Sequence, residues 1–238
     1  MSDYRGFLRE DFTVRGRNCF IAYPDAPAEG RKWIWRAEFP GAFDTVDVDL
    51  MKKGYALGYI GASDMYGCPE SVELMKAFYD EMVLRGFNKK TVIFGFSRGG
   101  LYSVNYALKY PETVAALYLD APVLDIKSWP GGMMTGVGSQ KEFDDCLALL
   151  GLDRTTVLTY KQNPVDRLEE LLALGVPVAL VAGDSDRVVP YCENGEYLEK
   201  TYKNGGGKLL CIVKEGCDHH PHSLEDPSPV SDFLTKIY

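Results

Sequence analysis

Apolar residues fall in short runs along the chain, and glycine, proline and polar residues separate these runs. Runs that are rich in β-branched and aromatic residues predict buried strands. They lie at about 18–23, 32–39, 54–60, 91–96, 114–119, 176–182 and 208–213. The first run is followed by a turn-rich segment at 24–30, which is typical of a hairpin opening.

Between these strands, apolar residues recur every three or four positions, which is the spacing of one helix face. The clearest stripe predicts a helix at 70–85, and Gly86 ends it. Further helices are expected near 46–50 and at 101–110, 164–174, 193–202 and 229–237. Strands that alternate with helices indicate an α/β fold, with a mostly parallel central sheet and helices on both faces.

This alternation stops between residues 123 and 163. The segment 129–138 is rich in glycine but also carries large apolar residues, and a short helical pattern follows at Phe143, Leu147 and Leu150. A long excursion within an α/β pattern is often a lid or a binding loop, and the alternative is a solvent loop over a hydrophobic edge. We therefore expect a single domain over 1–238, with a short lid insertion at about 123–163.

The sequence Gly95-Phe96-Ser97-Arg98-Gly99 lies where the strand at 91–96 meets the next helix. A strand, a sharp turn and a helix in this order place the serine at the apex of the turn. We expect a side chain at Gly95 or Gly99 to collide with a neighbouring segment, because the backbone doubles back tightly there. The alternative is a glycine turn with a surface serine. A serine hydroxyl becomes a nucleophile only if a base and an orienting acid lie within reach.

The histidines of the chain all lie in one run, as His219, His220 and His222. A histidine base must therefore come from this run, just beyond the last predicted strand. The cluster could instead bind a metal ion or be purely structural. Adjacent His219 and His220 would point apart on an extended chain, and no Cys or His group elsewhere has ligand spacing. We therefore expect no metal site, and the chemistry requires no cofactor.

Three aspartates compete for the role of the acid. Asp184 and Asp186 follow the strand at 176–182, and Asp120 ends the strand at 114–119. Catalytic groups of parallel sheets gather at the carboxyl ends of the strands. Each aspartate could also merely cap a turn, so the residues alone leave this choice open.

From about Cys19 to its end, the chain resembles the α/β-hydrolases. The resemblance rests on the order Ser, Asp, His and on three segments: the elbow at 95–99, Gly183-Asp184-Ser185-Asp186, and Gly216-Cys217-Asp218-His219. In that family the acid commonly stands three residues after the loop glycine, and the base follows a Gly-x-x pattern. The resemblance thus implies Ser97 as nucleophile, His219 as base and Asp186 as acid.

An oxyanion hole is made of backbone N–H groups. The resemblance implies that Arg98 supplies one of them. The family's frequent His-Gly pair after the third strand is missing here, and Trp35-Arg36-Ala37-Glu38 stands in its place. We expect the second donor in this segment, at Ala37.

Substrate contacts are expected from side chains on segments that should approach Ser97. These are Trp35, Glu38, Tyr66, Trp129, Met133, His220 and His222, with Trp33 nearby. Aromatic faces can stack on sugar rings, and the run from His219 to Pro229 resembles bacterial hydrolases often assigned to carbohydrate esters. The alternative is that these aromatic residues serve core and rim packing. Pro221 is expected to direct His222 away from Ser97.

Composition excludes several other classes of protein. A formal net charge of −8 argues against non-specific nucleic-acid binding, and no run approaches the roughly 20 apolar residues of a membrane span. The six cysteines form no Cys-x-x-Cys pair, so reduced thiols are expected. The first residues lack a secretory signal, which predicts a cytoplasmic protein if the sequence is the full gene product.

These observations predict a serine hydrolase that cleaves a small-molecule carboxylic ester through an acyl-enzyme. An acetyl or short-acyl ester of a carbohydrate is the expected substrate class. A thioesterase or a peptidase could use the same three residues, and a non-catalytic binding protein could share the fold. Nothing in the sequence predicts the oligomeric state.

Overall fold

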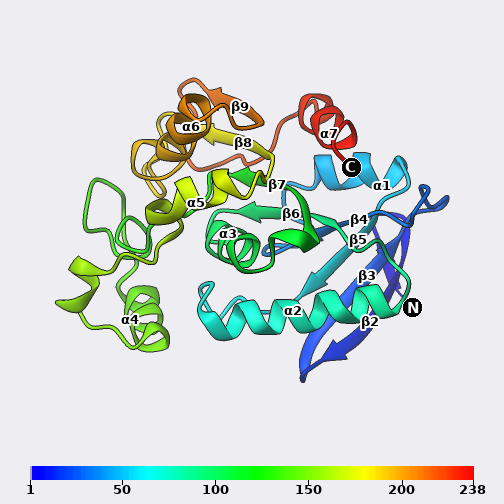
Figure 1. The fold of residues 1–238 in the computed structure, drawn as a ribbon, viewed down its shortest axis with the longest axis horizontal. Coiled ribbons are helices and arrows are strands. Elements are labelled where there is room, and N and C mark those ends of the chain that lie inside the picture. Colours follow the sequence, from blue (N-terminus) through cyan, green and yellow to red (C-terminus); the bar gives the residue numbers. More distant parts are fainter. Residues whose placement is uncertain (1) are drawn as a thin grey trace.

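The computed structural model describes residues 2–238, which form one nine-stranded sheet in the order β1-β2-β3-β5-β4-β6-β7-β8-β9 (Figure 1). The strands are β1 (Ser2–Tyr4), β2 (Phe7–Val14), β3 (Arg17–Tyr23), β4 (Trp33–Arg36), β5 (Ala56–Ile60), β6 (Thr91–Phe96), β7 (Val114–Asp120), β8 (Val178–Gly183) and β9 (Leu209–Lys214). From β5 across to β9 all neighbouring strands are parallel. The predicted α/β class with a mostly parallel sheet is therefore confirmed.

Helices cover both faces of this sheet (Figure 1). The α-helices are α1 (Thr45–Lys52), α2 (Pro69–Leu84), α3 (Gly99–Lys109), α4 (Gln140–Leu150), α5 (Leu168–Ala173), α6 (Gly195–Asn204) and α7 (Ser228–Thr235). Short 3-10 helices are η1 (Pro111–Thr113), η2 (Thr156–Thr159), η3 (Pro164–Arg167) and η4 (Tyr191–Glu193). Apolar residues of α1 and α7 share one buried cluster, and those of α2, α3, α5 and α6 share the other. Within residues 2–238, no helix combines the length and apolar character needed to cross a membrane.

The hairpin expected after residues 18–23 is wrong. β3 pairs antiparallel with β2 on one side and β5 on the other, and β4 lies parallel between β5 and β6. The segment 24–30 is therefore a crossing connection. β1 and β2 were not predicted, because Arg9, Glu10 and Asp11 interrupt the apolar pattern of β2. Charged residues of this kind are common on strands near a sheet edge.

The turn between β6 and α3 is as tight as its glycines suggest. A methyl group at Gly95 would lie 2.2 Å from Oγ of Ser103, so the predicted collision there is confirmed. A methyl group at Gly99 would lie 3.3 Å from Cβ of Glu38, a much milder contact. The tighter position is Gly100, where a methyl group would lie 2.6 Å from the carbonyl oxygen of Val123. Small residues at 95 and 100 thus let β7 and its following loop approach the elbow.

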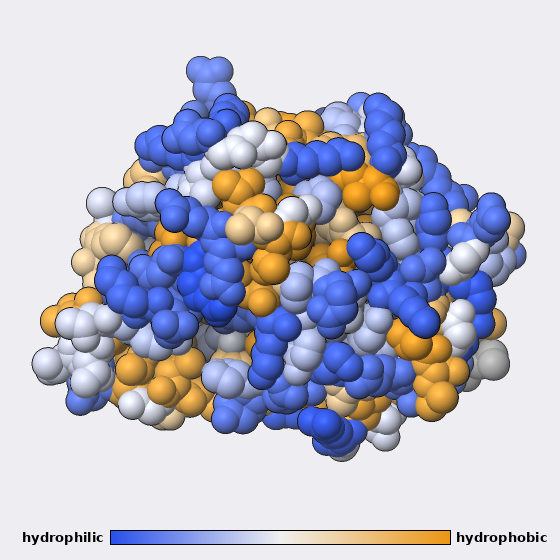
Figure 2. Space-filling view, viewed as in Figure 1, coloured by the Kyte–Doolittle hydropathy of each residue, from blue (hydrophilic) through white to orange (hydrophobic). Residues whose placement is uncertain are grey.

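The excursion at 123–163 begins inside the core and continues over the surface. The N–H of Val123 donates to the Ser97 carbonyl oxygen, and the N–H of Leu124 donates to Oδ1 of Asn194. The predicted helical pattern is present as α4, while Met133 and Val137 are exposed. On the face drawn in Figure 2, hydrophilic side chains cover most of the surface and apolar residues form separate patches. A lid role for this excursion stays a prediction.

A buried ion pair holds the loop that follows β4. Nε and Nη2 of Arg36 donate to the two carboxylate oxygens of Asp47 on α1, at 2.6 and 2.7 Å. Both side chains are 0% exposed. Nη2 also donates to the carbonyl oxygens of Ala42 and Phe43, and the guanidinium lies 3.8 Å from the ring centroid of Phe96. Arg36 thus joins the loop 39–43 to the residue that precedes Ser97.

Asp47→Ala should lower the free energy of unfolding by about 3–5 kcal/mol, because it leaves the Arg36 guanidinium buried without its counter-charge. Chemical denaturation measures this loss, and Asp47→Asn provides a milder variant if the alanine protein does not fold. Lys141→Ala is the control, since Lys141 pairs with Asp145 at the surface and should change stability by less than about 1 kcal/mol. Equal effects at both positions would contradict this account of the buried pair.

Candidate active site

The β6–α3 turn presents Ser97 in a backbone conformation that non-glycine residues rarely adopt. Its φ is 49°, in the left-handed region. The Ser97 N–H donates to the carbonyl oxygen of Asp120 at 2.9 Å, and the Ser97 carbonyl oxygen accepts the N–H groups of Gly100 and Val123. Neighbouring backbone therefore holds the serine in this conformation at the carboxyl end of the parallel strands.

Ser97 is the first member of a hydrogen-bonded chain of side chains. Its Oγ lies 3.0 Å from Nε2 of His219, and Nδ1 of the same ring lies 2.7 Å from Oδ2 of Asp186. His219 and Asp186 are both buried. The other carboxylate oxygen of Asp186 accepts the N–H groups of Val188 and Val189, each at 2.8 Å. The backbone thus fixes one oxygen of the Asp186 carboxylate, and the other oxygen, Oδ2, fixes the orientation of the His219 imidazole.

Two further aspartates fasten the loops that carry Asp186 and His219. Oδ1 of Asp184 accepts the N–H of Gly216 at 2.8 Å. Asp218 accepts the N–H groups of Arg187 and His219, and also bonds the Arg187 guanidinium. These bonds, those from Arg187 first, hold the pKa of Asp218 well below its usual range. Asp184 and Asp218 therefore position the histidine loop without contacting the imidazole of His219.

Gly183 shows how closely the two loops approach. A methyl group at this glycine would lie 2.2 Å from the carbonyl oxygen of Cys217. Such a clash with backbone could be relieved only by moving one of the loops. The absence of a side chain at the end of β8 is therefore a condition for bringing the histidine loop across the acid loop.

Asp120, the third acid considered from the sequence, pairs with a different histidine. Its Oδ1 lies 2.8 Å from Nδ1 of His222, and its Oδ2 accepts the N–H of Ser223 at 2.8 Å and the hydroxyl of Tyr118 at 3.0 Å. Burial raises the pKa of Tyr118 well above its usual range, so its hydroxyl keeps the proton that it donates. Asp120 and His222 form a second, buried carboxylate–imidazole pair next to the first.

The expected effect of Pro221 on His222 is wrong. The ring centroids of His219 and His222 are 4.7 Å apart, so His222 stays beside Ser97. The physical reason is the Asp120 carboxylate, which bonds the His222 ring from the end of β7. Local backbone direction at a proline could not reveal a partner that lies about a hundred residues earlier in the chain.

A small cavity opens directly at Ser97. Its volume is about 180 Å³, and its lining residues are Phe39, Ala42, Phe43, Phe96, Ser97, His219, His220 and His222. His220 is exposed and stacks on the ring of Phe43, with centroids 5.4 Å apart. Burial and the neighbouring imidazoles lower the pKa of His220. Two of the predicted substrate contacts, His220 and His222, therefore line the space next to the serine.

Two other predicted contacts belong to the core instead. Trp35 is fully buried and packs against Trp33, Phe78 and Tyr106. Trp33 is equally buried. The prediction that Trp35 contacts substrate is therefore wrong, and the alternative of core packing holds. Strand β4 lies in the middle of the sheet with helices on both sides, so its aromatic residues have no route to solvent.

Glu38 is also buried, and its charge is used within the protein. Its Oε2 accepts a hydrogen bond from Nε of Arg98 at 2.9 Å. Burial raises the pKa of Glu38, and the Arg98 guanidinium partly offsets this rise. Nη1 of Arg98 also donates to Oε1 of Glu142 on α4 at 3.1 Å. Glu38 thus anchors Arg98 between the elbow and the excursion, and the prediction of a substrate contact at Glu38 is wrong.

The remaining predicted contacts lie on the excursion or near it. Tyr66 is buried against Trp129, with ring centroids 6.4 Å apart. Met133 is 42% exposed. None of the three lines the cavity at Ser97. Contacts between these residues and a substrate stay a prediction.

Ala37 cannot serve as the second oxyanion donor in this structure. Its N–H donates to the carbonyl oxygen of Phe94 at 3.0 Å, continuing the ladder between β4 and β6. The predicted strand at 32–39 included Ala37, but the sequence could not show that β6 is the neighbour that takes this N–H. In the part of the chain that the structure describes, the N–H groups of Arg98, Glu38 and Phe39 donate to no other protein group.

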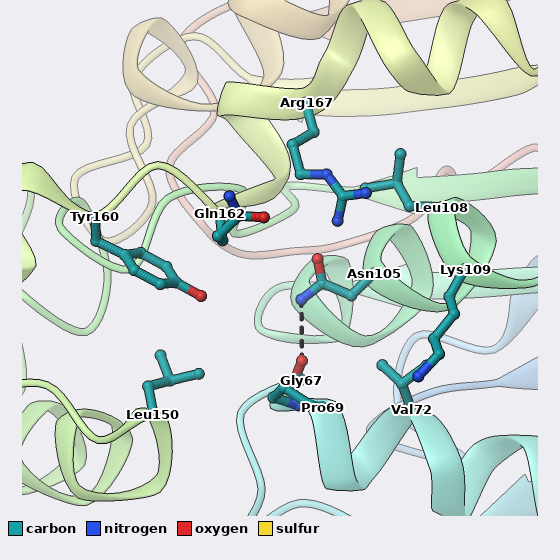
Figure 3. Close-up of a pocket in the computed structure, with 10 residues that line it drawn as sticks. All are labelled: Gly67, Pro69, Val72, Asn105, Leu108, Lys109, Leu150, Tyr160, Gln162 and Arg167. Carbon is teal, nitrogen blue, oxygen red and sulfur yellow. Dashed lines mark hydrogen bonds between the residues drawn. The ribbon is translucent and has the colours of Figure 1, made fainter.

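A second cavity lies between α2, α3 and the residues before α5 (Figure 3). It has a volume of about 530 Å³ and includes Asn105, Tyr160 and Arg167 in its lining. Nδ2 of Asn105 donates to the carbonyl oxygen of Gly67 at 2.9 Å, as drawn in Figure 3. None of Ser97, Asp186 and His219 lines this cavity, so it is not the space in which they could react.

Comparison with known proteins identifies the fold. No family model matches the sequence, and no curated protein matches it. Solved structures do match, and they establish that the chain has the α/β-hydrolase fold.

A puromycin-hydrolyzing peptidase of Mycobacterium tuberculosis is similar to 96% of this chain, with 15% identity and a TM-score of 0.70. Dipeptidyl peptidase 4 of Porphyromonas gingivalis is similar to 98% of the chain, with 14% identity and a TM-score of 0.72. A bacterial membrane phospholipase A is similar to 98% of the chain, with 14% identity and a TM-score of 0.61. The matches cover 38% and 36% of the two peptidase chains and 87% of the phospholipase chain. The chain thus spans little more than a third of the length of those peptidases.

Loss of charge at Asp184 and at Asp186, the two aspartates of the loop that follows β8, should change kcat to different extents. Asp186→Asn should lower kcat by on the order of 10⁴, because an amide no longer holds the His219 ring in the tautomer with a proton on Nδ1. Asp184→Asn is the matched control, since an amide oxygen can still accept the Gly216 N–H. Its kcat should stay within about tenfold of wild type. Steady-state hydrolysis of p-nitrophenyl acetate measures both, and a reversed order would assign the acid to Asp184.

Proposed function

We propose that this protein is a serine hydrolase that cleaves carboxylic esters through an acyl-enzyme. The observation that carries the proposal is the chain from Ser97 Oγ to His219 Nε2 at 3.0 Å and from His219 Nδ1 to Asp186 at 2.7 Å. It lies on a left-handed elbow in a fold that the peptidases and the phospholipase share. A binding protein without activity would have no need for this aligned arrangement.

In the proposed reaction, Ser97 Oγ attacks the ester carbonyl carbon while His219 Nε2 takes the hydroxyl proton. Asp186 stabilises the imidazolium that forms. The C–O bond to the alcohol then breaks, and His219 returns the proton to the departing alkoxide. Water attacks the acyl-enzyme by the same route, with its proton passing to His219 and then to Ser97, so the products are an alcohol and a carboxylic acid.

The oxyanion that forms during attack needs donors near Ser97. The N–H of Arg98 is the first proposed donor, because it follows the serine at the start of α3. For the second we propose Glu38 or Phe39 in place of Ala37. The Glu38 nitrogen lies 3.8 Å from the position that a methyl group at Gly99 would occupy, so this part of the loop passes beside the elbow.

The cavity suggests which acyl groups fit. Its volume of about 180 Å³ is below the roughly 300–1,000 Å³ of pockets that hold drug-sized ligands. Phe39, Phe43 and Phe96 give it an apolar lining beside Ser97. We therefore propose acetyl and other short acyl groups as the acid half of the ester. Trp33 and Trp35 are in the core, so these two aromatic residues do not support a carbohydrate as the alcohol half of the ester.

Peptide hydrolysis is the second candidate. It is supported by the similarity to the two peptidases, each of which is much longer than this chain. An amide needs the same attack, but its nitrogen must be protonated before the amine can leave. The oxygen leaving group of an ester leaves more easily. Matched ester and anilide substrates with chromogenic leaving groups therefore separate the two activities. Thioesters of short acyl chains form a third substrate set for the same assay.

We expect p-nitrophenyl acetate to be hydrolysed with a higher kcat/KM than p-nitrophenyl octanoate and than dipeptidyl p-nitroanilides. Ser97→Ala should keep the fold and lower kcat by on the order of 10⁴ to 10⁶, because the activated hydroxyl is gone. Thermal unfolding of the variant controls for folding. Efficient p-nitroanilide cleavage with poor ester cleavage would favour the peptidase, and near-wild-type esterase activity in Ser97→Ala would remove Ser97 from the mechanism.

A further inference from the structure

His219, His220 and His222 form a compact cluster of imidazoles at the cavity. Their ring centroids lie 4.7 to 4.9 Å apart, and the ring planes are inclined by 62° to 87° to one another. One nitrogen from each ring lies within 4.8 Å of those of the other two. The sequence argument assumed an extended chain at His219 and His220, and that assumption is wrong: the backbone bends at His219, and the two rings lie together.

Two of these rings are already held in the way that metal-binding histidines usually are. Nδ1 of His219 bonds Asp186, and Nδ1 of His222 bonds Asp120. Nε2 is then the nitrogen of each of these two rings that bonds no carboxylate, and in His219 it faces Ser97 Oγ at 3.0 Å. A carboxylate on the far nitrogen fixes the ring and raises its basicity as a ligand. The same two carboxylates also place negative charge next to a bound cation.

The third ring enters from the solvent side. His220 is exposed. Among residues 2–238, its aromatic neighbour outside the cluster is Phe43, which stacks on its ring. Within the same residues, Asp186 and Asp120 bond the other two rings, and no carboxylate bonds the ring of His220. Its ring can therefore turn toward the other two without breaking an ion pair.

We propose that His219, His220 and His222 bind a divalent transition-metal ion of the zinc type, and that this ion reversibly inhibits the hydrolase. Neutral imidazoles suit Zn²⁺, Cu²⁺ and Ni²⁺ far better than Mg²⁺ or Ca²⁺. Bonds of 2.0–2.1 Å in a tetrahedron place ligand nitrogens about 3.3 Å apart, so the rings must close by on the order of 1 Å. Exposed His220 supplies most of that movement, and water occupies the fourth position.

Inhibition follows from the atom that the ion uses. Nε2 of His219 is the nitrogen that lies 3.0 Å from Ser97 Oγ and that must accept its proton. A metal on this nitrogen occupies the same lone pair. The ion and the proton of Ser97 therefore exclude each other. This consequence rests on the proposed function, whereas metal binding itself does not.

Isothermal titration calorimetry with zinc chloride tests binding without any turnover. The full chain carrying Ser97→Ala, freed of metal by a chelator, should bind a single ion in the micromolar range. Co²⁺ in place of Zn²⁺ should give the visible absorption of a tetrahedral site. His220→Ala and His222→Ala should each weaken binding by about 10- to 100-fold or more. His220 is exposed, so its variant remains informative if His222→Ala does not fold.

Cys192→Ser and Cys217→Ser are the controls, because a thiol could also bind zinc. Cys192 is exposed, and Sγ of Cys217 lies 3.9 Å from the carbonyl oxygen of His220. Neither should change the affinity. The absence of binding up to roughly 100 μM Zn²⁺, or an affinity unchanged in His220→Ala, would overturn the site. In the wild-type protein, Zn²⁺ should inhibit ester hydrolysis at concentrations near its Kd, and a chelator should restore the activity. Zinc binding without esterase activity would contradict the proposed function and leave the metal site standing.

Discussion

The backbone conformation of Ser97 is the constraint on which the site depends. A residue with φ of 49° at the end of a central strand requires close neighbours that hold it there. Asp120 does this with its main chain, by accepting the Ser97 N–H, and its side chain holds His222 beside the serine. The end of β7 therefore organises both Ser97 and the second carboxylate–imidazole pair. The lack of side chains at Gly95 and Gly100 allows that approach.

Most of the fold could be predicted because its signals are local. Seven strands and the principal helices follow from runs and stripes of apolar residues, and the Gly-x-Ser-x-Gly turn lies where the pattern changes from strand to helix. β1 and β2 could not be predicted in this way, since the charged residues of β2 are solvated on a strand near the sheet edge. The partner of β3 was also out of reach, because strand order depends on crossing connections that local pattern does not encode.

Ser97 and the run that holds His219 were predictable because the glycine turn and the three histidines left few candidates. The choice of Asp186 and of His219 within that run came from the resemblance to the α/β-hydrolases, and the catalytic role of all three residues remains a proposal. Properties that depend on register were not predictable. The Ala37 N–H donates to the carbonyl oxygen of Phe94, and Trp35 faces the core. Both observations follow from how β4 pairs with β6. An aromatic residue on a central strand has the same sequence signature whether it packs or lines a site. The Asp120–His222 pair joins segments that are distant in sequence, so no local signal pointed to it.

The central claim is that Ser97 is a nucleophile activated by His219. Its most direct test is covalent labelling with a fluorophosphonate, which reacts with activated serines, followed by intact-mass and peptide mass spectrometry. The account predicts a single adduct, located on Ser97 and lost in a folded His219→Ala protein. An adduct on another residue, or a wild-type protein that folds but takes no label, would contradict it.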